Sequence, residues 1–236
     1  MAEAEMFPLR ARGVSVSLGG HRALDDVSLE IGARARTAVL GANGAGKSVL
    51  LRVLHGLIAP DAGSVAWGES GRRPAQAMVF QRPVLLRRPA LANIEYALAV
   101  NGVRGDERRD RALEAIGRVG LSHLAGRQAR VLSGGEQQRL ALARAWALRP
   151  QSRFCDEPAA ILDPNAAAEI ERLIGGIHAA GTAIVFATHH LGLARRLADE
   201  VVFLEQGRVA ERTETDRFFS SPASAEAQRY LQGELP

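Results

Sequence analysis

Apolar positions near the start of the chain alternate with polar ones. This spacing runs over residues 14–18 and 27–31, and the turn residues Gly19 and Gly20 follow the first segment. A period of two is typical of a strand with one buried face. The two segments therefore predict an N-terminal antiparallel sheet.

Farther along the chain, short apolar runs alternate with segments of helical periodicity. Strands are predicted at residues 37–40, 64–67, 77–80, 154–156, 183–188 and 201–204, and helices at 47–57, 164–180 and 191–198. Alternation of strand and helix implies a parallel sheet with crossover helices. Residues 83–150, rich in Ala, Leu, Arg and Glu, predict a helical insertion that includes helices at 91–100 and 106–119. We expect the last fifteen residues to form a small helical tail.

A glycine-rich loop separates the strand at 37–40 from the helix that follows it. Residues 41–48 read GANGAGKS and match GxxxxGK[ST] in the strand–loop–helix setting that this motif requires. Backbone N–H groups of such a loop converge on phosphate oxygens, and the helix N-terminus adds its positive dipole end. We expect Lys47 to reach the β and γ phosphates and the Ser48 hydroxyl to bind Mg²⁺. The motif predicts that the chain binds a nucleoside triphosphate.

Composition strengthens this interpretation and excludes other classes. The chain of 236 residues has one lysine, Lys47, against 29 arginines, so the loop retains lysine where a compact charge is needed. The single cysteine, Cys155, excludes a disulfide-built fold, and 47% hydrophobic residues exclude wholesale disorder. With no apolar run of about 18 residues and no signal-peptide pattern, we expect a soluble protein made in the cytoplasm.

Two adjacent carboxylates, Asp156 and Glu157, follow the strand predicted at 154–156. At the end of a strand beside the phosphate loop, Asp156 can hold Mg²⁺ through water and Glu157 can polarise an attacking water. The same residues are also compatible with an exposed acidic turn before Pro158.

A second anion site is predicted at the start of a helix after residue 132. Residues 132–139 read LSGGEQQR, in which Ser133 and Glu136 form the S-x-x-E pattern of a capping box. A hydroxyl and two glycine amides at a helix N-terminus also form an anion site. We expect this site to face a phosphate supplied by another subunit.

Together the GANGAGKS loop, LSGGEQQR, Asp156-Glu157-Pro158 and Ala187-Thr188-His189 resemble the ATPase subunit of ATP-binding cassette (ABC) transporters, over essentially the whole chain. The resemblance implies an α/β fold of the P-loop NTPase type, with a RecA-like parallel sheet core, an N-terminal antiparallel β subdomain and an inserted helical subdomain. It implies one ABC ATPase domain over residues 1–236, with the catalytic core at about 1–82 and 150–236 and the helical subdomain at about 83–149.

The resemblance also implies a role for each motif residue, in a dimer that closes head to tail. The implied nucleotide-binding residues are Leu18, Gly41, Asn43, Gly44, Ala45, Gly46, Lys47, Ser48 and Val49. The implied catalytic residues are Lys47, Gln81, Glu157 and the switch histidine His189. The implied ligands of Mg²⁺, which accompanies ATP, are Ser48, Gln81 and Asp156. The residues implied to contact the nucleotide of the other subunit are Ser133, Gly134, Gly135 and Asp163. Asp163 is also expected to cap a helix that has Pro164 at its first position.

This chain departs from the family pattern at four places. Leu18 stands where an aromatic residue usually stacks on adenine, which predicts little discrimination between bases. Ser152 and Arg153 interrupt the apolar strand before the acid pair, so we expect a weaker strand or an Arg153 guanidinium that extends to solvent. Ile161 replaces a serine of the linking loop, and His190 replaces an acidic residue.

The resemblance further implies partners and a location. We expect a separate membrane permease, an extracytoplasmic substrate-binding protein and a place on the cytoplasmic face of the membrane. Residues 79–89, VFQRPVLLRRP, resemble the matching segment of oxyanion importers, most closely the tungstate type, and their arginines Arg82, Arg87 and Arg88 could meet acidic groups of the permease. An exporter or lipoprotein-release ATPase would share the catalytic motifs.

Two further alternatives come from other classes of protein. A soluble cassette ATPase acting on DNA or ribosomes would suit the many arginines, but the net charge is only +4, aromatic residues make up 5%, and no long basic segment is present. We therefore expect no nucleic acid partner. A P-loop kinase would leave LSGGEQQR unexplained.

Overall fold

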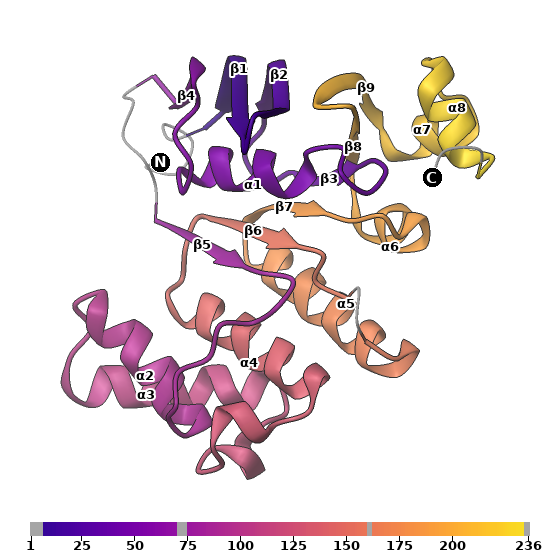
Figure 1. Ribbon diagram of the computed structural model, residues 1–236. Helices are drawn as coiled ribbons and strands as arrows, with labels where there is room; N and C mark the ends of the chain where they lie inside the picture. Colours follow the sequence, from indigo (N-terminus) through magenta and orange to yellow (C-terminus); the bar gives the residue numbers. More distant parts are fainter. Residues whose placement is uncertain (1–6, 70–74, 160–161, 234–236) are drawn as a thin grey trace.

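The computed structural model describes residues 7–69, 75–159 and 162–233, and its central element is a six-stranded sheet (Figure 1). In spatial order the strands are β5 (Gln76–Val79), β6 (Ser152–Asp156), β7 (Ala183–Ala187), β3 (Arg36–Leu40), β8 (Glu200–Glu205) and β9 (Arg208–Glu214). The first five run parallel, as the sequence predicts. The antiparallel edge strand β9 was not predicted.

A separate three-stranded antiparallel sheet is formed by the N-terminal part of the chain. Its order is β2 (His21–Ile31), β1 (Leu9–Leu18) and β4 (Ala62–Trp67). Both long strands begin earlier than the predicted segments at 14–18 and 27–31. The register shifts between Ala11 and Val14, where Gly13 adopts a φ of 59°, so the alternation of buried and exposed positions breaks there. Alternation alone could not reveal the first half of β1.

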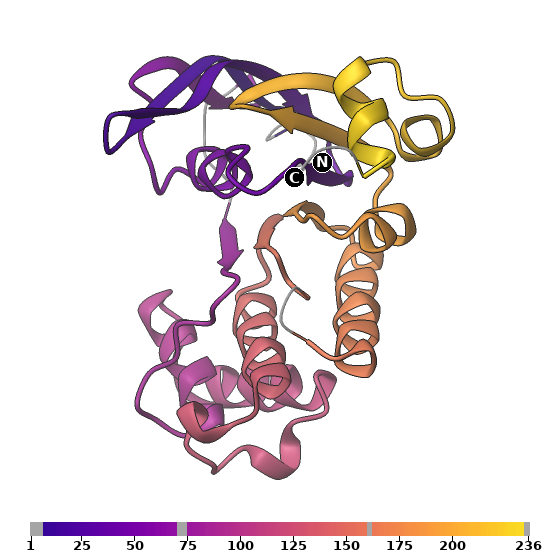
Figure 2. The same cartoon turned by 45° about the vertical axis from the view of Figure 1, so that its right-hand side comes forward.

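Helices cover both faces of the central sheet. On one face α1 (Lys47–His55) packs between the central strands and the N-terminal sheet, around buried residues such as Leu50 and Phe154. On the other face lie α4 (Gly134–Ala147), α5 (Pro164–Ala179) and α6 (Leu191–Leu197), with the C-terminal α7 (Thr215–Ser220) and α8 (Ala225–Leu231) beside them (Figure 2). Helix α1 ends two residues before the predicted boundary, because Gly56 adopts a left-handed conformation (φ 83°) and caps it.

Helices also form a lobe of their own below the sheet (Figure 1). It consists of α2 (Ala90–Val100), α3 (Gly105–Arg118), two short 3₁₀ turns, η2 (Ser122–Leu124) and η3 (Ala129–Val131), and the N-terminal part of α4. These elements enclose a separate apolar core that includes Leu98, Ile116 and Leu140. In the described ranges, no helix combines the length and the hydrophobicity that crossing a membrane requires.

The expectation for Ser152 and Arg153 is wrong. Both residues belong to β6, which pairs over its whole length with β7 and, from Ser152 to Cys155, with β5. Arg153 does not extend to solvent, since only 2% of its surface is exposed. Its neighbours on both strands fix its backbone in the sheet, and its side chain lies on the face covered by α4 and α5.

Candidate functional site

The loop between β3 and α1 requires glycine at two positions for steric reasons. Gly41 and Gly46 have φ values of 152° and 102°. A Cβ atom on Gly41 would lie 2.3 Å from the Leu204 carbonyl oxygen, and one on Gly46 would lie 2.5 Å from that of Ala23. The tight packing of this loop against β2 and β8 therefore depends on both glycines.

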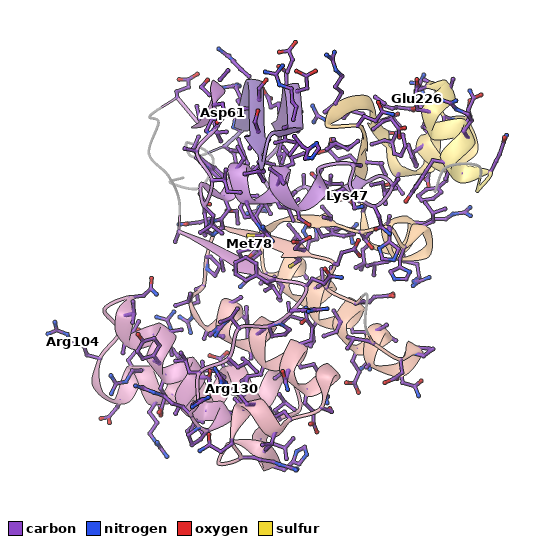
Figure 3. All side chains as sticks on the ribbon, viewed as in Figure 1. Lys47, Asp61, Met78, Arg104, Arg130 and Glu226 are labelled. Atoms are coloured by element: carbon purple, nitrogen blue, oxygen red, sulfur yellow. The ribbon has the colours of Figure 1, made fainter. Side chains whose placement is uncertain are left out.

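Lys47, labelled in Figure 3, is the first residue of α1 and follows this loop directly. Its Nζ donates hydrogen bonds to the carbonyl oxygens of Gly41 (2.8 Å) and Ala42 (2.9 Å), and only 7% of the residue is exposed. Burial lowers the pKa of Lys47, against the opposing effects of Glu157 and Asp156. The ammonium group is thus held beside the loop, at a site where phosphate oxygens could replace the carbonyl partners.

Ser48 and Asp156 bring the loop and the end of β6 together. The Ser48 hydroxyl donates a hydrogen bond to Oδ1 of Asp156 at 2.8 Å, and Nη2 of Arg52 lies 4.0 Å from Oδ2. Asp156 is 3% exposed, and this burial raises its pKa, while the Ser48 hydrogen bond and Arg52 act in the opposite direction. A desolvated carboxylate beside a hydroxyl is suited to a cation that shares both oxygens.

The next residue, Glu157, contacts the two residues that follow β7, Thr188 and His189. Its carboxylate accepts a hydrogen bond from Thr188 Oγ1 (3.1 Å) and lies 2.7 Å from Nδ1 of His189. Glu157 is 7% exposed and has a φ of 46°, which is unusual for a residue with a side chain. The His189 ring also faces the ring of His190, with 4.2 Å between their centroids. His190, one of the positions where this chain departs from the family pattern, therefore places a second imidazole beside that of His189.

One pocket of about 250 Å³ unites most of the predicted residues. Its lining residues are Ala23, Asn43, Gly44, Gly46, Lys47, Ser48, Val49, Gln81, Glu157 and His189. The pocket lies at the carboxyl ends of β3, β6 and β7, which is where ligands bind in open parallel sheets. Asp156 does not line the pocket itself, but it accepts a hydrogen bond from the lining residue Ser48. Leu18, at the end of β1, is 44% exposed and does not line this pocket.

The predicted trans-acting residues lie elsewhere. Ser133 forms the predicted capping box at the start of α4, donating from its N–H to Glu136 Oε2 (2.7 Å) and accepting from Glu136 N (3.4 Å). Asp163 caps α5 by accepting hydrogen bonds from Asn165 N and Ala166 N, both at 3.0 Å, as expected with Pro164 at the first position. Neither Ser133 nor Asp163 lines the pocket that holds Lys47. Ile161 lies outside the described residues.

Gly134 and Gly135, which follow Ser133, begin helix α4 and also lie outside the lining of that pocket. Gly134 is exposed, and nothing lies within 4 Å of where its Cβ would be. The helix start is therefore open at Gly134, whereas a Cβ on Gly135 would lie 3.2 Å from that of Ala166.

The segment after β5 is fixed by one buried amide. Asn93, fully buried on α2, accepts from Leu86 N (2.8 Å) and donates to the carbonyl oxygens of Arg88 (3.1 Å) and Pro89 (3.0 Å). Arg82, Arg87 and Arg88 are exposed on this segment, and the Arg88 guanidinium lies over the Tyr96 ring, 4.9 Å from its centroid.

Sequence reasoning missed three residues around the pocket. Thr188 orients Glu157 and also accepts a hydrogen bond from His190 N at 3.0 Å; its position beside His189 was a usable signal. Tyr230 on α8 places its hydroxyl 3.4 Å from the carbonyl oxygens of Gly41 and His189, and Ala23 on β2 lines the pocket. Both come from distant parts of the chain, so no local pattern could identify them.

The donor atoms at this site fit Mg²⁺. Ser48, Asp156 and Gln81 offer a hydroxyl, a carboxylate and an amide oxygen, the hard oxygen ligands that Mg²⁺ prefers. Among the described residues, no group of three or more His, Cys, Asp or Glu side chains could hold a metal ion. A magnesium site here would therefore rely on these mixed oxygens together with water and phosphate.

Comparisons with known proteins agree with this geometry. The family model for ABC transporters matches residues 24–160. The chain is 39% identical to the methionine import ATP-binding protein MetN of Caulobacter vibrioides, over 91% of this chain and 68% of the relative. It is 36% identical to the phosphate import ATP-binding protein PstB 2 of Natronomonas pharaonis, over 96% and 87%, and 39% identical to the tungstate uptake system ATP-binding protein TupC of Peptoclostridium acidaminophilum, over 86% and 95%.

A solved structure supports the same assignment. A dimeric ATP-binding cassette in a post-hydrolysis state, bound to ADP and Pi, superposes with a TM-score of 0.79 at 29% identity, covering 88% of this chain and 98% of that one. The fold of this chain therefore matches that of a cassette whose solved structure holds ADP and Pi. This chain is an ATPase that belongs to the ABC transporter family.

Proposed function

We propose that this ATPase powers a membrane importer of a small oxyanion such as tungstate. Two observations support the proposal: the 39% identity to a tungstate uptake ATPase that the chain covers over 95% of its length, and the VFQRPVLLRRP segment at residues 79–89. The phosphate import relative belongs to the same chemical class of cargo. The equal identity to a methionine import protein makes methionine the second candidate.

Within this function, we assign the chemistry of one nucleotide to the pocket at the strand ends. Glu157 accepts a proton from the attacking water, and Lys47 leaves its two carbonyl partners to bind the β and γ phosphates. His189 contacts the γ phosphate, and Gln81 orients the water. Bound Mg²⁺, held by Ser48, Gln81 and Asp156, would neutralise charge on the phosphate oxygens. The observation that supports this assignment is the single pocket lined by Lys47, Ser48, Gln81, Glu157 and His189.

The position of the LSGGEQQR segment supports a dimeric arrangement. Ser133, Gly134 and Gly135 lie outside the pocket of their own chain, at an exposed helix start whose amides can bind an anion. We assign them, together with Asp163, to the nucleotide of a second subunit in a head-to-tail dimer. Each active site is then complete only when two chains meet.

The remaining partners follow from the proposed role. A separate permease would recruit this subunit to the cytoplasmic face of the membrane, and an extracytoplasmic protein would deliver the oxyanion. We assign the permease contact to the helical lobe at about residues 83–149, within the domain of residues 1–236. Its exposed arginines Arg87 and Arg88, with Arg82 just before it, would face acidic groups of the permease.

The experiment replaces the chromosomal copy by Glu157→Gln and measures what the cells accumulate. We expect tungsten content, determined by mass spectrometry, to fall to the level of a deletion strain while uptake of labelled methionine is unchanged. Glu214→Gln, the same change at an exposed position at the end of β9 and outside the helical lobe, serves as the matched control. Loss of methionine uptake with normal tungsten content would reject oxyanion import in favour of the second candidate.

A further inference from the structure

Arg153 is a buried cation within the central sheet. Its Nε and Nη1 atoms are buried and have no hydrogen-bond partner, and no carboxylate in the described ranges forms an ion pair with it. Burial lowers its pKa to about 10, so the side chain remains charged at neutral pH. A buried charge with no partner is strongly unfavourable unless a counter-ion binds to it.

The Arg153 side chain lines a cavity of about 390 Å³. This cavity lies where β6 and β7 begin, between the ends of α3, α4 and α5, and its wall includes Arg111, Arg118, Arg149 and Thr182. The pocket with Lys47 lies at the other end of the same strands, and the two share no lining residue. The cavity is therefore separate from the ATP site.

A second arginine in the cavity wall also has unused donor capacity. Nη2 of Arg111 donates to the Ala147 carbonyl oxygen at 2.5 Å and Nη1 pairs with Glu107 at 3.3 Å, but its buried Nε has no partner. Arg111 and Arg153 thus line the same cavity, and each has guanidinium nitrogens without a hydrogen-bond partner. Two such forks match the oxygens of a phosphate-type anion.

The other charged groups of the cavity wall leave a positive excess. Arg118 lies over the Trp146 ring (3.9 Å to its centroid) and pairs with Glu114 at 3.2 Å, and Arg149 pairs with Glu114 at 3.6 Å. Glu114 is the one acidic residue that lines the cavity among the described residues, against four arginines. The wall can therefore neutralise an anion of more than one negative charge.

We propose that this cavity binds a small multivalent oxyanion of the phosphate class, held chiefly by Arg153 and Arg111. Its volume suits phosphate, pyrophosphate or the phosphate group of a small metabolite, whereas an acidic peptide would need an extended groove. The wall combines residues of the helical lobe, on α3, with residues of the central sheet, at the start of β6 and just before β7. A bound anion therefore stabilises the contact between lobe and sheet.

The test separates this site from the phosphate loop by using a Lys47→Ala background. Inorganic phosphate and pyrophosphate are titrated calorimetrically into the full-length variant at constant ionic strength, with sodium chloride as the control anion. We expect at least one of the two to bind with one site per chain. Adding Arg153→Met should weaken binding at least tenfold, and adding the exposed Arg104→Met should leave it unchanged.

A second variant and a second readout keep the proposal testable if Arg153→Met folds poorly. Arg111→Met should weaken the same binding severalfold, and phosphate should raise the Tm of the Lys47→Ala protein but not that of the variants lacking Arg153 or Arg111. The proposal is overturned if neither anion binds more tightly than chloride, or if both arginine variants bind like the Lys47→Ala protein. The second result would mean that the anion binds outside this cavity.

Discussion

His189 Nδ1 lies 2.7 Å from Oε1 of Glu157, although 31 residues separate the two in sequence. The contact exists because β6 and β7 are parallel neighbours, so that the residues following each strand reach the same edge of the sheet. Glu157 N also donates to the Ala187 carbonyl oxygen at 2.9 Å, which joins the two strand ends through their backbones. The contact between Glu157 and His189 therefore depends on the order of the strands in the sheet.

Glu157→Gln should stop steady-state hydrolysis and leave ATP binding intact. The amide keeps the shape of the side chain but is a far weaker base, and removal of a positioned base costs about 10² to 10⁴ in rate. Phosphate release and nucleotide titration on the same preparation measure the two effects. Turnover near that of the wild type would remove Glu157 from this role.

Thr188→Val should lower kcat about tenfold with little change in ATP affinity. The fully buried Thr188 hydroxyl donates to Glu157 Oε2 at 3.1 Å, and a hydrogen bond to a charged group is worth about 1.5–3 kcal/mol. Thr188→Ser retains the hydroxyl and should restore most of kcat. If serine and valine reduce kcat equally, the methyl packing matters and the hydrogen bond does not.

Asp199→Asn should remove part of the acid sensitivity of folding. A hydrogen bond from Arg36 lowers the pKa of Asp199 below its ordinary value, so the folded state binds fewer protons than the unfolded state. The resulting stability is complete above about pH 4 and is lost as the pH falls through the folded-state value. The carboxylate is partly exposed, and we expect about 0.2–1 kcal/mol at pH 7.

Urea unfolding between pH 2 and pH 7 checks this prediction. The stability difference between wild type and Asp199→Asn should shrink as the pH falls. Asp110→Asn, at an exposed position on α3, is the control and should follow the wild type. A difference that stays constant with pH would show that the Arg36 contact does not depend on the charge of Asp199.

Leu18→Tyr should tighten ATP binding. An aromatic ring adds about 1–3 kcal/mol per stacked base, whereas leucine offers only apolar contact. The wild type should bind ATP and GTP within about tenfold, a gap of about 1.4 kcal/mol. Nucleotide titration of the Glu157→Gln protein, with and without the substitution, measures both. A strong preference for ATP that Leu18→Tyr does not change would mean that another residue holds the base.

The sequence predicted the features that depend on short local motifs. The GANGAGKS loop, the capping box at Ser133 and the Asp163 cap each depend on residues within a few positions of one another. Their geometry follows from backbone conformations and hydrogen bonds that the motif itself encodes.

The remaining features depend on contacts between distant segments. The antiparallel strand β9 has few buried positions, so its sequence lacks a clear strand pattern. Arg153 breaks the apolar pattern of β6, yet the pairing with β5 and β7 outweighs its strand preference. Tyr230 reaches the phosphate loop only because α8 packs beside β8 through Phe203, at 5.0 Å between ring centroids.

The central claim is that one active site needs residues from two chains, and mixing two inactive variants tests it most directly. In the proposed arrangement, Lys47→Ala loses the phosphate contact of its own site, and Ser133→Arg blocks the nucleotide site of its partner. Each variant alone should be inactive. In a mixed dimer, the Lys47 of one chain meets the Ser133 of the other, so one site is intact.

The measurement is the ATPase rate of the equimolar mixture, followed over a dilution series. Random pairing predicts recovery of about a quarter of wild-type activity, with a rate that rises with the square of protein concentration when the protein is dilute. No recovery on mixing, together with full wild-type activity per chain at high dilution, would contradict the composite site.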